Sequence, residues 1–111
     1  MTTTARPLFT AQYAANSQTT YYTSSGVRTI IDKMTGYNGP AGAVPLAVNL
    51  VASAGTAAAT NLLGLRPLAA GETYTFPEIV GHVLEAGGFI SVIAGAATSI
   101  VIRSSGREVT S

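Results

Sequence analysis

The sequence predicts an all-β protein, folded as a single small β-sandwich of the immunoglobulin-like or jelly-roll-like type with about seven to nine short strands. Two observations favour this fold. Apolar side chains alternate with small or polar ones along several segments, which is the period of a strand with one face in a core. Turn signals rich in glycine and serine separate these segments at intervals of about 10 to 15 residues. We expect at most one short helical turn.

Five segments carry the clearest strand patterns. In the first, Leu46, Val48 and Leu50 alternate with smaller or polar neighbours, and Pro45 suits the start of a strand. The other four are Val27–Ile31, Thr73–Phe76, Phe89–Ala94 and Ser99–Arg103, which are rich in β-branched or aromatic side chains. Weaker candidates are Leu8–Tyr13, Thr19–Thr23 and Leu62–Leu68, the last of which is interrupted by glycine and proline.

The segments between the strands contain turn residues. Gly36–Gly42 and Ser104–Gly106 are predicted loops, and Ala52–Ala59 is interpreted as a loop that could hold a helical turn. The segment after Pro77 has two interpretations. It could be a helix that begins at Pro77 and is capped by Gly87, or a turn that leads into a short strand at His82–Leu84. Gly81 and the β-branched residues favour the second, which leaves room for one helical turn at Pro77–Val80.

These patterns predict one domain with two flanking segments. Residues 8–103 form the β-sandwich, because every strand candidate lies within them. Residues 1–7, which contain three consecutive threonines, are predicted to be a flexible N-terminal arm, and residues 104–111 a flexible C-terminal tail.

Charge is unusually scarce. Six Lys and Arg and five Asp and Glu make 10% of the 111 residues, where an ordinary soluble domain carries about 25%. A monomer of this size should expose about 5,700 Å², so only about one charge is expected per 500 Å². An uncharged surface with many outward Ala, Val, Leu and Thr side chains is typical of a protein that meets a partner. We therefore expect a homo-oligomer, with a trimer as the first hypothesis, or a subunit of a larger array.

The charge balance argues against nucleic acid and membrane partners. The net charge is only +1, and the six basic residues are scattered rather than clustered. Tyr21, Tyr22 and Tyr37 could stack on bases beside Arg28 and Lys33, but the weak charge favours core or rim positions for these tyrosines. The longest apolar stretch, Phe89–Ile102, has 14 residues, short of the ~20 that a membrane-spanning helix needs.

We predict no catalytic, cofactor-binding or metal-binding residues. His82 is the sole histidine, cysteine is absent, and no motif marks a serine as activated. The glycine series Gly36-x-x-Gly39-x-x-Gly42 lacks the lysine and serine of a phosphate-binding loop. The carboxylates show neither metal-ligand spacing nor a marked pair and are predicted to be solvated turn and edge residues: Asp32, Glu72, Glu78, Glu85 and Glu108.

Several short motifs give the chain a family resemblance. They are Thr4-Ala5-Arg6-Pro7, Thr20-Tyr21-Tyr22-Thr23, Arg28-Thr29-Ile30-Ile31, Leu68-Ala69-Ala70-Gly71-Glu72-Thr73-Tyr74, Gly81-His82-Val83-Leu84-Glu85-Ala86-Gly87-Gly88 and Ile100-Val101-Ile102-Arg103. Over residues 4–109 the chain resembles small virion structural proteins of tailed phages and prophages. The Gly36–Gly42 loop departs from this family by being longer and richer in glycine.

The resemblance implies a non-enzymatic particle component. The first expectation is a capsid decoration or cement protein that binds the major capsid protein on the head surface, with Thr4, Arg6 and Tyr37 as shell contacts. The alternative is a tail-tip, fibre or neck accessory subunit that acts as an adaptor or a host-surface, carbohydrate-binding module. For a carbohydrate module Tyr74, Phe76 and Phe89 could be recruited, although their alternation favours core burial. The start of the sequence lacks a signal-peptide pattern, so we expect synthesis and folding in the host cytoplasm and a final place in the virion.

Overall fold

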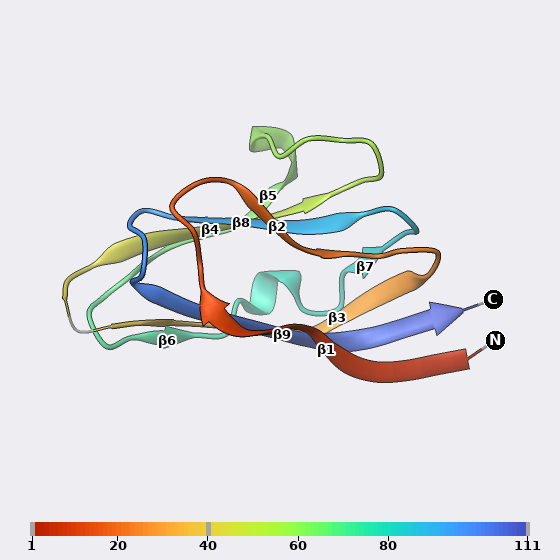
Figure 1. The fold of residues 1–111 in the computed structure, drawn as a ribbon, viewed down its shortest axis with the longest axis horizontal. Coiled ribbons are helices and arrows are strands. Elements are labelled where there is room, and N and C mark those ends of the chain that lie inside the picture. Colours follow the sequence, from red (N-terminus) through yellow and green to blue (C-terminus); the bar gives the residue numbers. More distant parts are fainter. Residues whose placement is uncertain (1, 40, 111) are drawn as a thin grey trace.

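The protein is a two-layer β-sandwich, seen edge-on in Figure 1. The structure is a computed structural model, and it describes residues 2–39 and 41–110. Over these residues it contains nine strands and two short 3-10 turns. The strands are β1 (Thr2–Tyr13), β2 (Thr19–Thr23), β3 (Arg28–Asn38), β4 (Val44–Val51), β5 (Leu62–Leu68), β6 (Thr73–Tyr74), β7 (Val83–Leu84), β8 (Phe89–Ala94) and β9 (Ile100–Thr110), and the turns are η1 (Ala59–Asn61) and η2 (Pro77–Ile79). The predicted fold class is confirmed.

The strand order is that of a jelly roll rather than an immunoglobulin domain. Sheet A has the order β1-β9-β3-β6, with the short β7 also paired to β3, and sheet B has the order β2-β8-β4-β5. All pairings are antiparallel, and most consecutive strands lie in different sheets. The chain therefore winds around the sandwich and places sequence-distant strands side by side, as jelly rolls do.

The core lies between the two sheets and is made by alternate residues of their long strands. Leu46 and Val48 of β4 are fully buried, and so are Ile100 and Ile102 of β9. Because alternate side chains of a strand point to opposite faces, the residues between them point outward. The whole molecule exposes 5637 Å², close to the area expected for a compact chain of this size.

Phe76 closes the core on the side where β5 and β6 lie. Its side chain is fully buried, although its backbone has a φ of +43°, which is rare for a residue with a bulky side chain. Gly64 on sheet B makes room for the ring, because a Cβ there would lie only 3.0 Å from it. Gly36 on sheet A lies on the other side of the ring, where a Cβ would be in ordinary contact at 3.5 Å. Phe76 is therefore a core residue and is not available to a ligand.

Most strands lie where the sequence places them. Thr19–Thr23, Leu62–Leu68 and Phe89–Ala94 have the predicted bounds, and the first two of these were the weaker predictions. The segment after Pro77 is not a helix: η2 is a single helical turn, and Val83–Leu84 is a short strand, as the favoured interpretation predicts. A second 3-10 turn, η1, was not expected, and it begins at the end of the predicted loop Ala52–Ala59.

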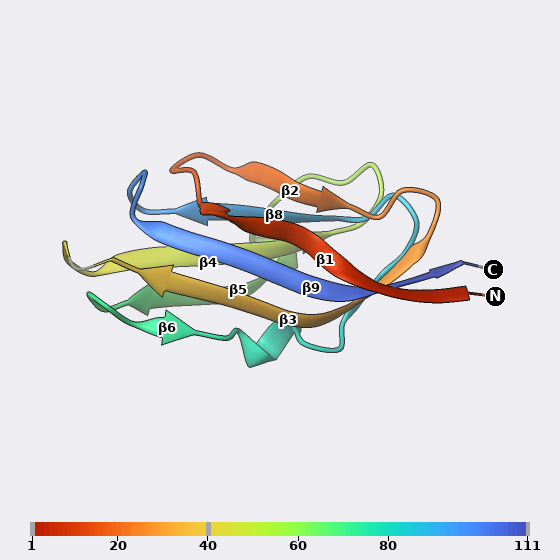
Figure 2. The same cartoon turned by 60° about the horizontal axis from the view of Figure 1, so that its bottom comes forward.

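The predicted flexible segments are strands instead. Residues 2–7 belong to β1 and residues 104–110 to β9, and the two pair with each other from Thr2 opposite Thr110 to Pro7 opposite Ser105. Ser104–Gly106 is not a loop, because Ser104 is buried and its hydroxyl donates to the carbonyl of Lys33 at 2.8 Å. Figure 2 shows the N- and C-terminal ends side by side at one end of the molecule. Met1 and Ser111, which belong to the predicted flexible segments, lie outside the described residues.

The predicted loop at Gly36–Gly42 begins later than expected. β3 continues to Asn38, and Gly36 lies opposite Ile102 of β9 and Tyr74 of β6. Glycine is needed at this position because a Cβ would lie 2.9 Å from a methyl group of Leu46. This glycine therefore permits close packing of the two sheets and does not mark a turn.

Candidate functional site

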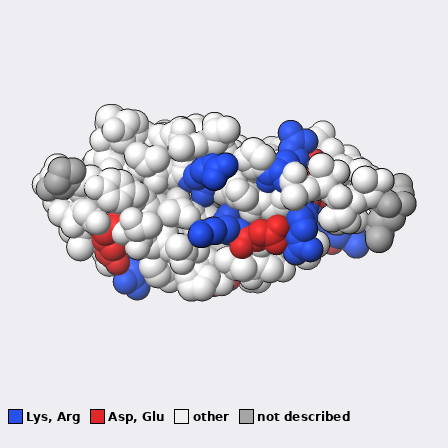
Figure 3. Space-filling model, turned by 90° about the horizontal axis from the view of Figure 1, so that it is seen from below, with Lys and Arg blue, Asp and Glu red and all other residues white. Residues whose placement is uncertain are grey.

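The two sheets differ sharply in charge. The strands of sheet A carry seven charged residues, which are Arg6, Arg28, Asp32, Lys33, Arg103, Arg107 and Glu108. The strands of sheet B, within the described part of the chain, carry Arg66 alone, and Arg66 lies on the edge strand β5. Figure 3 shows the molecule from the sheet A side, where basic and acidic side chains gather over the middle of the face.

The charged groups of sheet A form exposed ion pairs. The Arg107 guanidinium donates from Nη2 to Asp32 Oδ1 at 2.9 Å and from Nε to both carboxylate oxygens. This contact raises the pKa of Arg107 further above its usual value, so the pair stays charged. Arg28 pairs with Glu85 at 3.1 Å across the end of the sheet. Exposed pairs of this kind add little stability, and they keep the outer face of sheet A hydrated.

The outer face of sheet B has an apolar centre. Ala47 of β4 lies opposite Leu65 of β5 on one side and Ile93 of β8 on the other, and residues opposite each other in an antiparallel sheet point to the same face. Leu65 is 61% exposed and is the most exposed of the large hydrophobic side chains. A shallow groove of about 200 Å³ runs along this row, lined by Pro45, Ala47, Leu65, Ile93, Ala94 and Gly95.

A second hollow of about 320 Å³ continues this face toward the loop after β4. It is lined by Gln18, Ala47, Asn49, Ala57, Ala58, Ala59, Leu62 and Ile93. Asn49 fixes the loop, because its amide nitrogen donates to the Ala58 carbonyl at 3.0 Å and to Asn61 Oδ1 at 2.7 Å. Asn61 in turn donates to the Thr56 carbonyl at 2.8 Å. We call the residues that line these two hollows the uncharged face.

The uncharged face combines apolar surface with a lack of ionisable side chains. None of the residues that line its two hollows is ionisable. A standard protein interface covers about 800 Å² on each partner, which is about one seventh of the 5637 Å² that this chain exposes. Covering this face would remove apolar surface from water without stripping water from a charge.

The residues predicted as shell contacts lie elsewhere. Thr4 and Arg6 are on the edge strand β1, where Arg6 pairs with Glu108 at 3.1 Å. Tyr37 is near the end of β3 opposite Val101 of β9, far along the sheet from that pair. All three are exposed or edge residues of sheet A, and the structure does not bring them together at one place. Sequence reasoning predicted an uncharged surface but did not place it on these strands, although residues 34–65 form a continuous run without a charged residue.

The carboxylates are all engaged in contacts within the fold. Glu72 is bound by Arg66 and by the Ala69 backbone amide, and mainly the latter contact lowers its pKa. Glu78 accepts a hydrogen bond from the Tyr74 hydroxyl at 2.9 Å, which raises the pKa of Tyr74. The other three, Asp32, Glu85 and Glu108, pair with arginines. Within residues 2–39 and 41–110, no group of three or more His, Asp and Glu is placed to hold a metal ion.

One hollow is lined by a serine, a histidine and a glutamate, which are the residue types of a catalytic triad, but their side chains are not hydrogen-bonded to one another. Ser53, His82 and Glu85 all line a cavity of about 500 Å³ next to β7. None of the hydrogen bonds in the described structure joins any two of these side chains, and the Glu85 carboxylate is bound by Arg28. A relay from base to nucleophile needs such contacts. The structure therefore gives no support to a catalytic role for His82.

Comparison with known proteins finds a likeness in fold alone. No protein-family model matches the chain, and no curated protein matches its sequence. Among solved structures, the chain is similar to a subunit from Bacillus endospore appendages, which are described as a novel family of disulfide-linked pili. The TM-score is 0.53 at 15% sequence identity, over 99% of this chain and 90% of that one. Among the described residues, no helix is long and apolar enough to cross a membrane.

Proposed function

We propose that this chain is a non-enzymatic structural subunit of a tailed-phage virion, and that it binds the head shell as a decoration or cement protein. Its partners are the major capsid protein and further copies of itself, with a trimer as the first expectation. The proposal is carried by the uncharged face, which offers an apolar surface on one sheet while the other sheet keeps a hydrated, charged surface.

The contrast between the sheets gives the subunit an orientation. The uncharged face packs against the particle because burying it costs no desolvation of charge. Sheet A, with its ion pairs, faces water. The contact made by one copy is small, but many copies bound to a repeating shell give a high overall avidity.

The likeness to a pilus subunit supports a role in assembly. The similar protein is part of disulfide-linked pili and has the same sandwich fold. This chain has no cysteine, so disulfides formed by these residues cannot link its copies. The same likeness favours the second candidate, a tail, fibre or neck accessory subunit, because a pilus is an elongated assembly and not a shell.

The location and copy number in purified particles test the proposal. Gold labelling of the protein is combined with quantitative mass spectrometry of the same particles. Label over the head at hundreds of copies is the expected result. Label on the tail or neck at a few copies would replace the decoration role with the accessory role, and absence from the particles would overturn both.

A matched pair of variants tests the docking surface itself. Leu65→Lys places a charge on the uncharged face, whereas Thr35→Lys places the same charge on the outer face of sheet A. Both positions point outward, so both variants should fold. We expect incorporation of Leu65→Lys into particles to fall at least about tenfold, which corresponds to 1.4 kcal/mol, and that of Thr35→Lys to stay normal. Equal incorporation of the two variants would exclude the uncharged face as the docking surface.

A further inference from the structure

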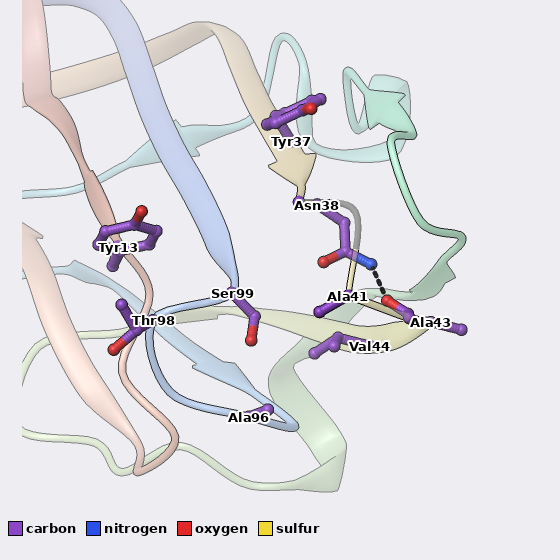
Figure 4. A pocket seen from close by; sticks show the side chains of 11 residues that line it. Tyr13, Tyr37, Asn38, Ala41, Ala43, Val44, Ala96, Thr98 and Ser99 are labelled. Atoms are coloured by element: carbon purple, nitrogen blue, oxygen red, sulfur yellow. Dashed lines mark hydrogen bonds between the residues drawn. The ribbon is translucent and has the colours of Figure 1, made fainter.

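A further cavity, which we call the end cleft, lies at one end of the sandwich. It has a volume of about 480 Å³ and is formed where β1 and β3 end and where the loops around residues 41–44 and 96–99 meet. Figure 4 shows its lining side chains. The end cleft shares no lining residue with the two hollows of the uncharged face. Its size falls within the range of small-ligand sites.

Two exposed tyrosines line the end cleft. Tyr13 is 54% exposed and Tyr37 is 43% exposed. The hydroxyls of the other three tyrosines are used within the fold: Tyr21 accepts from the Ala15 amide, Tyr22 donates to Glu108 and Tyr74 donates to Glu78. Within the described residues, the hydroxyls of Tyr13 and Tyr37 make no such bond. The two tyrosines whose hydroxyls are not used in hydrogen bonds within the described fold are therefore Tyr13 and Tyr37, which line this cleft.

Asn38 supplies a fixed polar group in the same cleft. Its side chain is buried, and its amide nitrogen donates to the carbonyl of Gly42 at 2.7 Å and to that of Leu68 at 2.9 Å. These donations fix the orientation of the amide, because only the NH₂ group can donate to carbonyl oxygens. The Asn38 carbonyl oxygen is then turned the other way, toward Ser99 (Figure 4).

The loop at residues 96–99 adds two hydroxyls. Thr98 and Ser99 both line the end cleft, and Ser99 donates to the Ala97 carbonyl at 3.1 Å. Thr98 has a φ of +56°, a left-handed conformation that is costly for a β-branched residue. Strain of this kind is concentrated at ligand sites, where it holds a side chain in a required place.

The chemistry of the lining selects a class of ligand. None of the described residues that line the end cleft is charged, so the site offers no oppositely charged partner for a phosphate, a carboxylate or an ammonium group. Tyrosine rings pack against the C–H faces of a sugar, and amide and hydroxyl groups bind its hydroxyls. We infer that the end cleft binds a neutral saccharide chain, in which one unit packs on Tyr13 and a neighbouring unit on Tyr37, and in which sugar hydroxyls are hydrogen-bonded to Asn38, Thr98 and Ser99.

This inference is independent of the proposed function. A saccharide site on a head protein or on a tail protein would attach the particle to neutral glycans of a surface. The residues that carry it lie outside the uncharged face, so failure of either proposal leaves the other intact.

Titration of the full chain with neutral trisaccharides tests the site. Maltotriose, mannotriose and triacetylchitotriose are each added to about 20 mM while backbone amide resonances are followed by NMR, a range that detects millimolar affinity. At least one should shift resonances confined to Tyr13, residues 37–44 and residues 96–99. No shift with any of the three would overturn the inference. Shifts of the same resonances with protein concentration alone would also overturn it, because a second copy would then fill the cleft.

Tyrosine variants provide the second readout. Tyr13→Ala and Tyr37→Ala should each weaken binding at least about tenfold, whereas Tyr13→Phe and Tyr37→Phe keep the ring and should weaken it less. Val80→Ala, at an exposed residue outside the end cleft, is the matched control and should bind as the unaltered chain does. The amide spectrum of each variant reports whether it is folded. Unchanged affinity in both alanine variants would contradict the inference.

Discussion

The Tyr22 hydroxyl donates a hydrogen bond of 2.5 Å to Glu108 Oε2, and this bond joins sheet B to sheet A. The same hydroxyl lies 2.7 Å from the Thr29 hydroxyl, which lies 2.7 Å from that of Ser24. The other carboxylate oxygen of Glu108 is bound by Arg6. A polar network thus links strands of both layers at the end of the sandwich where the chain termini lie.

Removal of the Tyr22 hydroxyl should destabilise the fold. Tyr22→Phe keeps the ring but leaves Glu108 and Thr29 without this partner, so we expect a loss of about 1–2 kcal/mol in the free energy of unfolding. Urea denaturation measures this loss. The matched control is Tyr37→Phe, whose hydroxyl has no partner in the described residues, and its change should stay within about 0.5 kcal/mol. Equal effects of the two variants would argue against the network.

Stability should fall at alkaline pH. Burial raises the pKa of Tyr22 above its ordinary value of 10.0, and the hydrogen bond to Glu108 raises it further. The folded chain therefore resists loss of this proton more than the unfolded chain does. The contribution is fully present below pH 10 and is lost as the pH rises through the folded-state pKa. Thermal melting between about pH 8 and pH 11 should show this fall, and a fall of equal steepness in Tyr22→Phe would exclude Tyr22 as its source.

Gly106 should tolerate no side chain. A Cβ at this position would overlap the backbone carbonyl oxygen of Ile30 on the neighbouring strand and lie 3.1 Å from a methyl group of Leu8. Because backbone and core would have to shift together, Gly106→Ala should cost about 1–3 kcal/mol by chemical denaturation. At Gly39 the nearest atom to a Cβ, the Ser99 carbonyl oxygen, is 3.7 Å away, so Gly39→Ala is the control. A near-neutral Gly106→Ala would show that the approach of β9 to β3 is looser than described.

Phe76 should be among the most sensitive core positions. Phe76→Ala would empty the space that Gly64 leaves for the ring, and we expect a loss of about 3–5 kcal/mol. If the alanine variant does not fold, Phe76→Leu gives a smaller loss that can be measured by calorimetry. Val83→Ala, at a residue that is 45% exposed, should change stability by less than about 1 kcal/mol. A loss for Phe76→Leu no larger than that for Val83→Ala would contradict the assigned core role.

The fold class was predictable because the start of β4 and much of β3 and β9 follow the period of a half-buried strand. The ends of β1 and β9 were not predictable from local pattern. Ser104–Gly106 has the composition of a turn, and it is held in a strand by pairing with residues about 70 and 100 positions away in the sequence. Gly36 was misinterpreted for a similar reason, since its role depends on the distant Leu46.

The candidate site was less predictable than the fold. The scarcity of charge predicted an exposed uncharged surface, and the uncharged face is consistent with that prediction. The sequence could not indicate which strands share this face, because Ala47, Leu65 and Ile93 come together only through the strand order of sheet B. Tyr37 was singled out as an exposed aromatic residue, and the structure adds Tyr13 beside the same cleft.

The position of β9 between β1 and β3 governs the timing of folding. β1 is synthesised before the other described strands and β9 after them. Because β9 lies between β1 and β3, the centre of sheet A is missing until β9 has left the ribosome. Until β9 arrives, β1 and β3 have no common neighbour, and their edges stay open to pairing with other chains. Closing contacts across about 100 residues is slow, and topologies of this kind refold in milliseconds to seconds. The nascent chain is therefore most prone to aggregate in the interval before β9 is made.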